Sequence, residues 1–328
     1  SIDTVVELMG GLEPAREFVT RALRAGKNVV SANKLMLSHH YAQIAQAAQE
    51  SGAAVRASAS VGGGIPYLHN LLRARRVDAI RWVGGIVNGT TNLILDTMQT
   101  EGAGFEHALS EAQRLGYAEA DPSSDIDGID ARSKLTISMN IAFGGVADTH
   151  LVPTEGIGRL TSADVALFKR MGRVCRFLAH AQRFDDGAVC ASVEPTLVEA
   201  DAPEAAVRKN DNMISFEGEY VGVQRFFGQG AGKFPTAYAV VEDLADVAAH
   251  PGRSHLRAGE APLSLDARRI ERRYYLRTSA PVELEADVLG DVGNAKAYLT
   301  APVCVMDMHA LAARLRRADE GAFFAAVR

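Results

Sequence analysis

The stretch TVVELMGGLEPAREFVTRALRAGKNVVSANK, residues 4–34, alternates short apolar runs with a longer segment of helical character. TVVELM and NVVS are typical of short buried strands, and residues 13–25 are typical of a helix with Pro14 in its first turn. A helix over residues 34–51 and a strand over residues 54–59 repeat the pattern. This order predicts a parallel sheet with crossover helices. Ligands bind at the carboxyl ends of such strands, here residues 9–11, 31–34 and 60–64.

The usual opening of a dinucleotide-binding domain is missing before Thr4. Such a domain begins with a strand, a G-x-G-x-x-G turn and a helix. The sequence therefore predicts a doubly wound domain that lacks its first units.

The pattern changes after VGGGIP, residues 61–66. We expect a strand over residues 76–87, followed by helices over 88–99, 104–116 and 123–142. Short β-like segments then follow at residues 176–181, 188–195, 213–217 and 222–227. Helices beside a mixed sheet indicate an α+β domain.

The last part of the chain predicts a third, smaller unit. A long amphipathic helix over residues 235–249 precedes it, and Pro251 and Gly252 mark the boundary. YYLRTSA (274–280) is expected to be a strand, VELEADVLGDVG (282–293) a helix, and APVCVMDMHALAARLRRA (301–318) a strand followed by a helix.

The predicted fold class is therefore α/β, with a partial Rossmann-type parallel sheet, an α+β second domain and a small C-terminal unit. The expected boundaries are residues 1–62 for the first domain, completed by about 233–250, then 63–232 and 253–328.

Composition narrows the class of protein. A net charge of −5 gives no reason to expect nucleic acid as a partner, because phosphate binding needs clustered Lys and Arg. No apolar run reaches the roughly 18 residues of a membrane span. Three widely spaced cysteines favour a reduced compartment such as the cytoplasm. The nine histidines show no HxxxH spacing, which argues against a histidine metal site. A small-molecule partner is the remaining expectation.

Five carboxylates and one lysine are concentrated in GYAEADPSSDIDGIDARSK, residues 116–134. One explanation is a well-capped helix start with an Asp–Lys pair at i,i+4. The alternative is a binding site, in which carboxylates hold an ammonium group and Lys134, one helical turn after Asp130, acts in the same cleft.

Several motifs in one fixed order resemble homoserine dehydrogenase over residues 4–249. They are SANK (31–34), ASVGGGIP (59–66), NGTTN (88–92), LGYAEADPSSDIDGIDARSKL (115–135), GQGAG (228–232) and PTAYAVVEDL (235–244). The resemblance implies reduction of L-aspartate 4-semialdehyde to L-homoserine with NADP or NAD, on the way to threonine and methionine. It also implies a homodimer or higher homo-oligomer formed through the substrate domain.

The same resemblance implies roles for charged residues. Glu119 and Asp130 match the pair that grips the substrate, Lys134 the catalytic lysine and Lys34 a second lysine, while Asp125 supports the network. An ammonium group can stabilise the negative charge that develops on oxygen during aldehyde reduction and can deliver the proton. The competing explanations are helix-end acids and a surface lysine.

Polar and glycine residues complete the expected site. Thr90 and Thr91 are expected to orient the substrate carboxylate, although a simple N-cap explains them nearly as well. Contacts to the cofactor, beside Lys34, are expected from Met9, Gly10, Gly116, Gly230 and Gly232. Glycines at turns often serve only the turn.

Residues 58–65 resemble a loop whose backbone carbonyls hold a monovalent cation. The carbonyls would be those of Ser58, Val61, Gly63 and Ile65, and the cation would be sodium. The family usually has Glu at the position of Ser58. The alternative is a glycine-rich turn that joins two domains. The C-terminal region resembles an ACT domain but lacks its D-x-P-G turn.

Two rival functions stay open at this point. A non-catalytic amino-acid-binding or regulatory homologue would explain the absent phosphate loop, although Glu119, Asp130, Lys134 and Lys34 are all present. A dehydrogenase for a different semialdehyde or a 3-hydroxy acid would need another substrate that bears an ammonium group.

Overall fold

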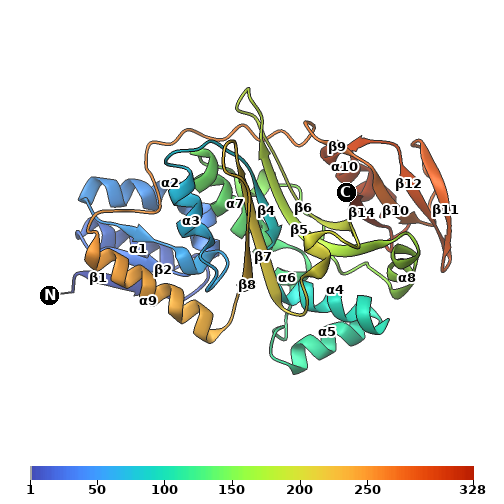
Figure 1. Cartoon of the computed structure of the whole chain (residues 1–328), viewed down its shortest axis with the longest axis horizontal. Helices are drawn as coiled ribbons and strands as arrows, with labels where there is room; N and C mark the ends of the chain where they lie inside the picture. Colours follow the sequence, from blue (N-terminus) through green and yellow to red (C-terminus); the bar gives the residue numbers. More distant parts are fainter. Residues whose placement is uncertain (1) are drawn as a thin grey trace.

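A computed structural model describes residues 2–328, and it places a small parallel sheet at one end of an elongated molecule (Figure 1). Strands β1 (Thr4–Glu7), β2 (Asn28–Ser31) and β3 (Val55–Arg56) form this sheet in the order β1-β2-β3. The predicted parallel sheet is confirmed. The third strand is shorter than predicted because the chain turns into the 3-10 segment η1 (Ser58–Ser60).

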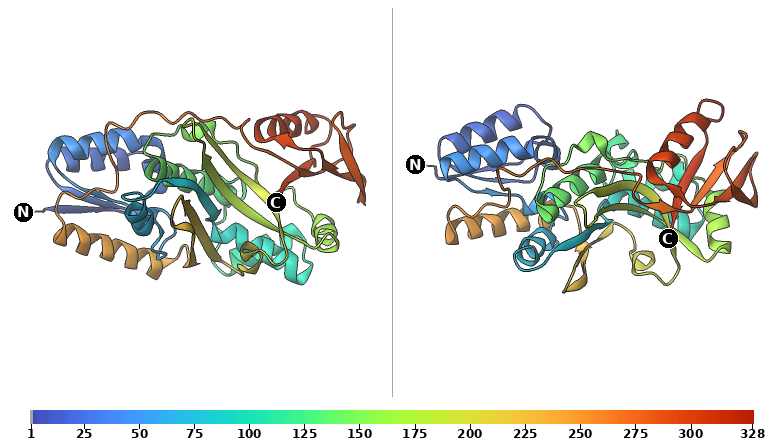
Figure 2. Two further views of the ribbon diagram at one scale, coloured as in Figure 1. Left: turned by 45° about the horizontal axis from the view of Figure 1, so that its top comes forward. Right: turned by 90° about the horizontal axis from the view of Figure 1, so that it is seen from above.

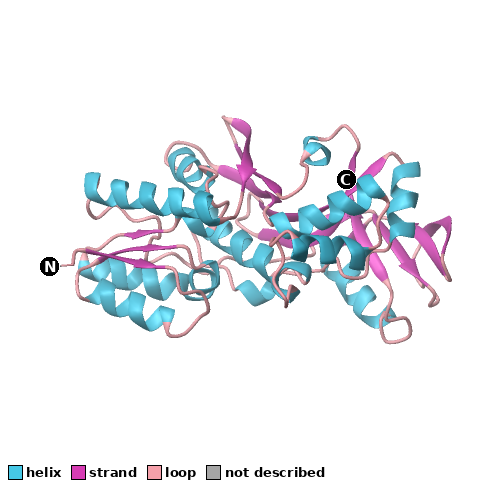
Figure 3. Cartoon of the chain, turned by 90° about the horizontal axis from the view of Figure 1, so that it is seen from below, coloured by secondary structure: helices cyan, strands magenta, loops and turns pink. Residues whose placement is uncertain are grey.

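Helices lie on both faces of the small sheet (Figures 2 and 3). Helices α1 (Ala15–Arg24) and α2 (Lys34–Ser51) pack together on one face. Helix α9 (Lys233–Ala249), which is distant in sequence, packs on the other face, where Val240 and Val247 contact Val30. The later part of the chain therefore contributes to the first domain.

A nine-stranded sheet forms the rest of the molecule, in the order β11-β12-β10-β14-β6-β5-β4-β7-β8. Its first five strands in the chain are antiparallel neighbours: β4 (Ile80–Ile86), β5 (Arg173–Arg183), β6 (Val189–Glu199), β7 (Asp211–Gly218) and β8 (Gly222–Gln229). Near the end of β4, a Cβ atom at Gly85 would lie 2.1 Å from the carbonyl oxygen of Met213. Only glycine allows this close strand pairing.

The C-terminal strands continue the same sheet. They are β10 (Tyr274–Thr278), β11 (Ala286–Val292), β12 (Ala295–Thr300) and β14 (Phe323–Val327), and helix α10 (Val305–Leu315) packs on them. A separate short pair joins β9 (Glu271–Arg272) to β13 (Val303–Cys304). Strand β14 pairs in parallel with β6, where Ala326 lies opposite Thr196. The C-terminal unit is thus joined to the central sheet by backbone hydrogen bonds.

The helix predicted over residues 282–293 is wrong, because this segment is mostly strand β11. Val292 pairs with Ala295, so Gly293 and Asn294 form a two-residue hairpin loop, and Gly293 has φ +61°. A Gly-Asn pair between two β-forming runs is a hairpin signal. Cross-strand pairing with β12 outweighs the weak helical character of the segment.

The remaining helices pack mainly around the larger sheet: α3 (Tyr67–Ala74), α4 (Gly89–Glu101), α5 (Phe105–Arg114), α6 (Ser123–Ile126), α7 (Ile129–Phe143) and α8 (Ser162–Arg170). Helix α7 contacts α2 on one side and strands β4 and β5 on the other, so it bridges the two sheets. Among the described residues, no helix is long and apolar enough to cross a membrane.

The single helix predicted over residues 123–142 is broken into α6 and α7. Gly128 separates them with φ +83°, a conformation that other residues rarely adopt. A Cβ atom there would lie 2.7 Å from Thr154 Cγ2 and 2.9 Å from Phe177 Cζ. The break lets α7 begin immediately before Asp130.

Candidate active site

The carboxylate of Asp130 lies between two lysines. Lys134 Nζ is 2.8 Å from one carboxylate oxygen and Lys34 Nζ is 2.8 Å from the other. The side chain of Asp130 is 3% exposed, that of Lys134 8% and that of Lys34 44%. The predicted contact between Asp130 and Lys134 is confirmed, and the structure adds Lys34 to it.

Two different helices bring these three residues together. Asp130 and Lys134 lie one turn apart at the start of α7. Lys34 is the first residue of α2, and the side chain of Asn33 caps that helix by accepting the N–H of Met36 at 3.1 Å. Packing of α2 against α7 therefore forms the cluster.

Asn88 connects the cluster to a second carboxylate, and sequence reasoning did not assign it a role. Its side-chain amide donates to Asp130 Oδ2 at 2.8 Å and to Asp125 Oδ1 at 2.6 Å. Lys134 Nζ also donates to the carbonyl oxygen of Val87, at 2.8 Å. The available signal was the position of Asn88, at the end of a strand and the N-cap of α4.

The charges of Asp130 and Lys34 each shift the pKa of the other toward its ionised form. Burial alone would raise the pKa of Asp130, but the ammonium groups of Lys134 and Lys34 outweigh it and hold this pKa below its ordinary value. The negative charge of Asp130 in turn raises the pKa of Lys34, against the effect of burial. Burial, followed by the nearby charge of Asp130, raises the pKa of Asp125.

A cavity of about 440 Å³ opens beside this cluster at the carboxyl ends of β1 and β2. This is the edge of the sheet where the sequence predicts a ligand. The residues lining the cavity are Leu8, Gly10, Gly11, Ala32, Asn33, Lys34, Leu35, Ser124, Ile129, Asp130, Ser133 and Thr236.

Buried Glu7 fixes the two strand ends that form the cavity. Its carboxylate accepts the hydroxyl of Ser31 at 2.7 Å and the backbone N–H of Met9 at 2.8 Å. Asn33 donates its side-chain amide to the carbonyl oxygen of Gly11 at 2.8 Å. These contacts hold the backbone of both loops in place.

The predicted substrate residues outside the cluster differ in their surroundings. Glu119 is exposed, and its charge contributes to raising the pKa of Lys34. The hydroxyl of Thr90 donates to the carbonyl oxygen of Tyr117 at 2.8 Å. The N–H and hydroxyl of Thr91 both donate to Asn88 Oδ1, which favours the N-cap explanation for this residue.

The predicted cofactor residues are only partly brought together. Gly10 and Lys34 line the cavity, whereas Met9, Gly116, Gly230 and Gly232 do not belong to its lining. Gly116 follows the end of α5, and Gly232 is the N-cap of α9. A Cβ atom at Gly230 would lie 2.1 Å from Asn212 Nδ2, so this glycine serves local packing.

The predicted cation loop is tied to helix α9. The backbone N–H and the hydroxyl of Ser58 both donate to the carboxylate of Asp243, each at 2.8 Å. The carbonyl oxygen of Ile65 accepts the N–H of Tyr67 at 2.7 Å. Among the described residues, no group of three or more His, Cys, Asp or Glu side chains forms a metal site.

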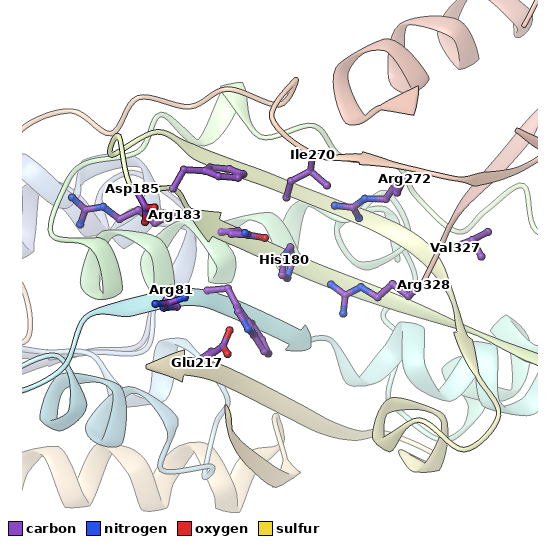
Figure 4. A pocket seen from close by; sticks show the side chains of 12 residues that line it. Arg81, His180, Arg183, Asp185, Glu217, Ile270, Arg272, Val327 and Arg328 are labelled. Atoms are coloured by element: carbon purple, nitrogen blue, oxygen red, sulfur yellow. The ribbon is translucent and has the colours of Figure 1, made fainter. Parts of the chain in front are cut away.

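A larger cavity, of about 690 Å³, lies on the central sheet (Figure 4). Arg81, His180, Glu217, Arg272 and Arg328 are among the side chains around it. None of the residues predicted from the sequence to form the site lines this cavity. The lysine–aspartate cluster therefore marks the smaller cavity as the candidate active site.

Comparisons with known proteins show the family to which the chain belongs. Residues 66–245 match the family model described as homoserine dehydrogenase, and residues 1–58 match the model of the homoserine dehydrogenase NAD-binding domain. The homoserine dehydrogenase of Corynebacterium glutamicum is 40% identical over 296 residues, which are 89% of this chain and 66% of that protein. The enzyme of Synechocystis is 43% identical over 249 residues, or 75% of this chain and 58% of that protein. The chain thus spans less than two thirds of the length of these relatives.

Solved structures show the same similarity. A homoserine dehydrogenase from Thiobacillus denitrificans superposes with a TM-score of 0.88 at 34% identity, covering 100% of this chain and 82% of that one. A hyperthermophilic archaeal homoserine dehydrogenase in complex with NADPH gives a TM-score of 0.64 at 27% identity, covering 75% of this chain and 72% of that one. The family models, the sequence identities and the shared fold together place this chain in the homoserine dehydrogenase family.

Proposed function

We propose that this chain interconverts L-homoserine and L-aspartate 4-semialdehyde with NAD or NADP. The observation that carries the proposal is the Lys34–Asp130–Lys134 cluster beside the cavity at the ends of β1 and β2. These strands belong to the segment that matches the family's NAD-binding domain.

Lys134 is suited to act on the substrate oxygen. An ammonium group has three N–H donors, and two acceptors, Val87 O and Asp130 Oδ2, lie 2.8 Å from its nitrogen. One N–H therefore remains for the aldehyde oxygen. In the direction of reduction, this N–H stabilises the negative charge on oxygen and supplies the proton, while Asp130 orients the lysine.

The residues around the cavity fit a nicotinamide cofactor, which supplies or accepts the hydride when bound. A Cβ atom at Gly10 would meet no protein atom within 4 Å, so open space lies beside its backbone. Gly10 and Gly11 line the same cavity as Lys34 and Asp130. We assign these glycines and Lys34 to the nicotinamide side of the site.

The acids near the cluster suit the ammonium group of the substrate. Asn88 holds Asp125 and Asp130 together, and Glu119 follows on the loop after α5. Since two lysines neutralise Asp130, Asp125 and Glu119 are the carboxylates left for a substrate cation. Thr90 stands at the N-terminus of α4, where a substrate carboxylate would be favoured.

The proposal is tested by homoserine-dependent reduction of NADP⁺ or NAD⁺, followed by absorbance. In Glu119→Gln we expect KM for homoserine to rise about tenfold with a smaller change in kcat, because a hydrogen bond between charged groups contributes roughly 1.5–3 kcal/mol. Glu111→Gln is the matched control, since Glu111 is an acid on α5 that pairs with Arg114. Equal KM values in the two variants would remove Glu119 from the substrate site, and no reduction with either nucleotide would contradict the proposed activity of this chain.

We also propose a sodium ion held by the carbonyls of Ser58, Val61, Gly63 and Ile65. The left-handed conformations of Gly62 and Gly63 curve this loop, and Asp243 places a carboxylate next to Ser58. A higher thermal midpoint in sodium chloride than in choline chloride at equal ionic strength would support the ion. Identical midpoints would refute it.

The proposed homo-oligomer has a candidate contact at strand β8, an edge strand of the large sheet. Exposed Tyr220, Val221 and Phe227 lie on or next to this strand, and unpaired edges pair readily with a second chain. Light scattering of the 35.0 kDa chain would show twice this mass for a dimer. The cytoplasmic location stays a prediction.

A further inference from the structure

We propose that a second cavity, between β3, α3 and residues 253–257, binds a small dianion of the phosphate class. This cavity, here called the basic cavity, has a volume of about 410 Å³. Its lining consists of Arg56, His69, Leu72, Arg76, Arg253, Ser254, His255 and Arg257. It shares no lining residue with the candidate active site.

Arg56 is the first reason to expect an anion. Its side chain is only 2% exposed, and its Nη1 lies 3.3 Å from the carboxylate of Asp246. Its Nε and Nη2 have no hydrogen-bond partner among the described residues. Buried donors are nearly always paired in folded proteins, so the unmet N–H groups of a guanidinium that lines a cavity indicate a missing acceptor.

The contact between Arg56 and His255 is an independent second reason. His255 Nδ1 accepts the backbone N–H of Ala57 at 3.1 Å, so the proton of the neutral ring is on Nε2. Burial, followed by the charge of Arg56, lowers the pKa of His255 to about 3, so the ring is neutral at ordinary pH. Nε2 nevertheless lies 3.0 Å from Nη1 of Arg56, which is also a donor. Two donors face each other, and Asp243 Oδ1 lies 4.0 Å from Nε2, beyond hydrogen-bond distance. An oxyanion in the cavity would satisfy both donors.

The net charge of the basic cavity favours a dianion over a monoanion. Four arginines line it, and two carboxylates of the described residues lie against the lining. Asp246 pairs with Arg56 and lies 3.8 Å from His69, and Asp243 lies 4.0 Å from His255. The side chains of Arg76, Arg253 and Arg257 are exposed and form no ion pair with a carboxylate within the described part of the chain. Guanidinium groups bind phosphate oxygens in a forked arrangement, so phosphate chemistry fits this set of donors.

The basic cavity lies apart from the candidate active site. Strand β3 is at one edge of the small sheet, and the active-site cavity is lined by the ends of β1 and β2. The segment that closes the basic cavity is held to β3 by His255, whose backbone N–H donates to the carbonyl oxygen of Val55 at 2.8 Å. The proposed site thus depends on the fold and not on the proposed activity.

Calorimetric titration of the full chain with inorganic phosphate, at constant ionic strength set by sodium chloride, tests the proposal. We expect saturable binding that is at least tenfold weaker in the double variant Arg253→Gln, Arg257→Gln. Both side chains are exposed, so the fold should persist in this variant. Arg73→Gln is the matched control, because Arg73 is an exposed arginine of α3 outside the basic cavity, and it should bind phosphate as the unaltered chain does.

Two further ligands define the class of anion. Glycerol 3-phosphate that binds more tightly than phosphate would identify a phosphate ester as the ligand, whereas equal affinity would identify free phosphate. Succinate that binds as tightly as phosphate would overturn the phosphate class. Absence of saturable heat with phosphate would overturn the site itself. An equal loss of phosphate affinity in Arg73→Gln and in the double variant would also overturn it.

Discussion

Replacement of Lys134 by alanine is expected to lower kcat by about a thousandfold, the usual range for loss of a group that stabilises a developing oxyanion and donates its proton. KM for homoserine should change much less, because in the proposed mechanism Lys134 acts on the oxygen whose charge changes during the reaction. Steady-state reduction of NADP⁺ and NAD⁺ measures both constants. The fold should persist, since Asp130 keeps its ion pair with Lys34.

Lys169→Ala provides the control for this result. Lys169 is an exposed lysine in the last turn of α8, outside the cavity. Its replacement should leave kcat unchanged. A kcat for Lys134→Ala within tenfold of the unaltered chain would exclude Lys134 as the proton donor and would leave Lys34 as the candidate.

Replacement of Asp130 by asparagine is expected to lower the free energy of unfolding by about 3 kcal/mol, the lower end of the range for breaking a buried ion pair. Lys134 is 8% exposed and would lose its counter-ion, although its bond to Val87 would remain. Lys34 is 44% exposed and can be solvated, so it should contribute little to the loss. Urea denaturation followed by circular dichroism measures the difference.

The pH dependence of the difference in unfolding free energy between Asp130→Asn and the unaltered chain identifies the origin of that difference. The pKa of Asp130 is held below its ordinary value, so the folded state favours the ionised carboxylate. Its contribution to stability is complete above the ordinary aspartate pKa, near 3.9, and is lost as pH falls toward the folded value. The difference in unfolding free energy between Asp130→Asn and the unaltered chain should therefore be greatest at pH 7 and should decrease below about pH 4.

Asp201→Asn serves as the control for both measurements. Asp201 is an exposed acid in the loop after β6. Its replacement should change stability by less than about 0.5 kcal/mol, as surface substitutions usually do. A stability gap for Asp130→Asn that did not change between pH 7 and pH 3 would show that the ion pairs are not its cause.

The sequence by itself determined several of the local elements and one of the two ion pairs of Asp130. The strand over residues 28–31 and the helix over residues 34–51 agree with β2 and α2. Asp130 and Lys134 could be paired in advance because a spacing of four residues on a helix fixes their neighbourhood. The motifs of the family supplied the remaining candidates.

Only the tertiary structure decided which distant residues meet. Lys34 reaches Asp130 because α2 packs on α7, and Asn88 joins two carboxylates because β4 ends beside that helix. The C-terminal strands belong to the same sheet as the central strands because β14 pairs with β6. Local sequence encodes backbone preference over a few residues, whereas these contacts depend on the packing of segments that lie far apart in the chain.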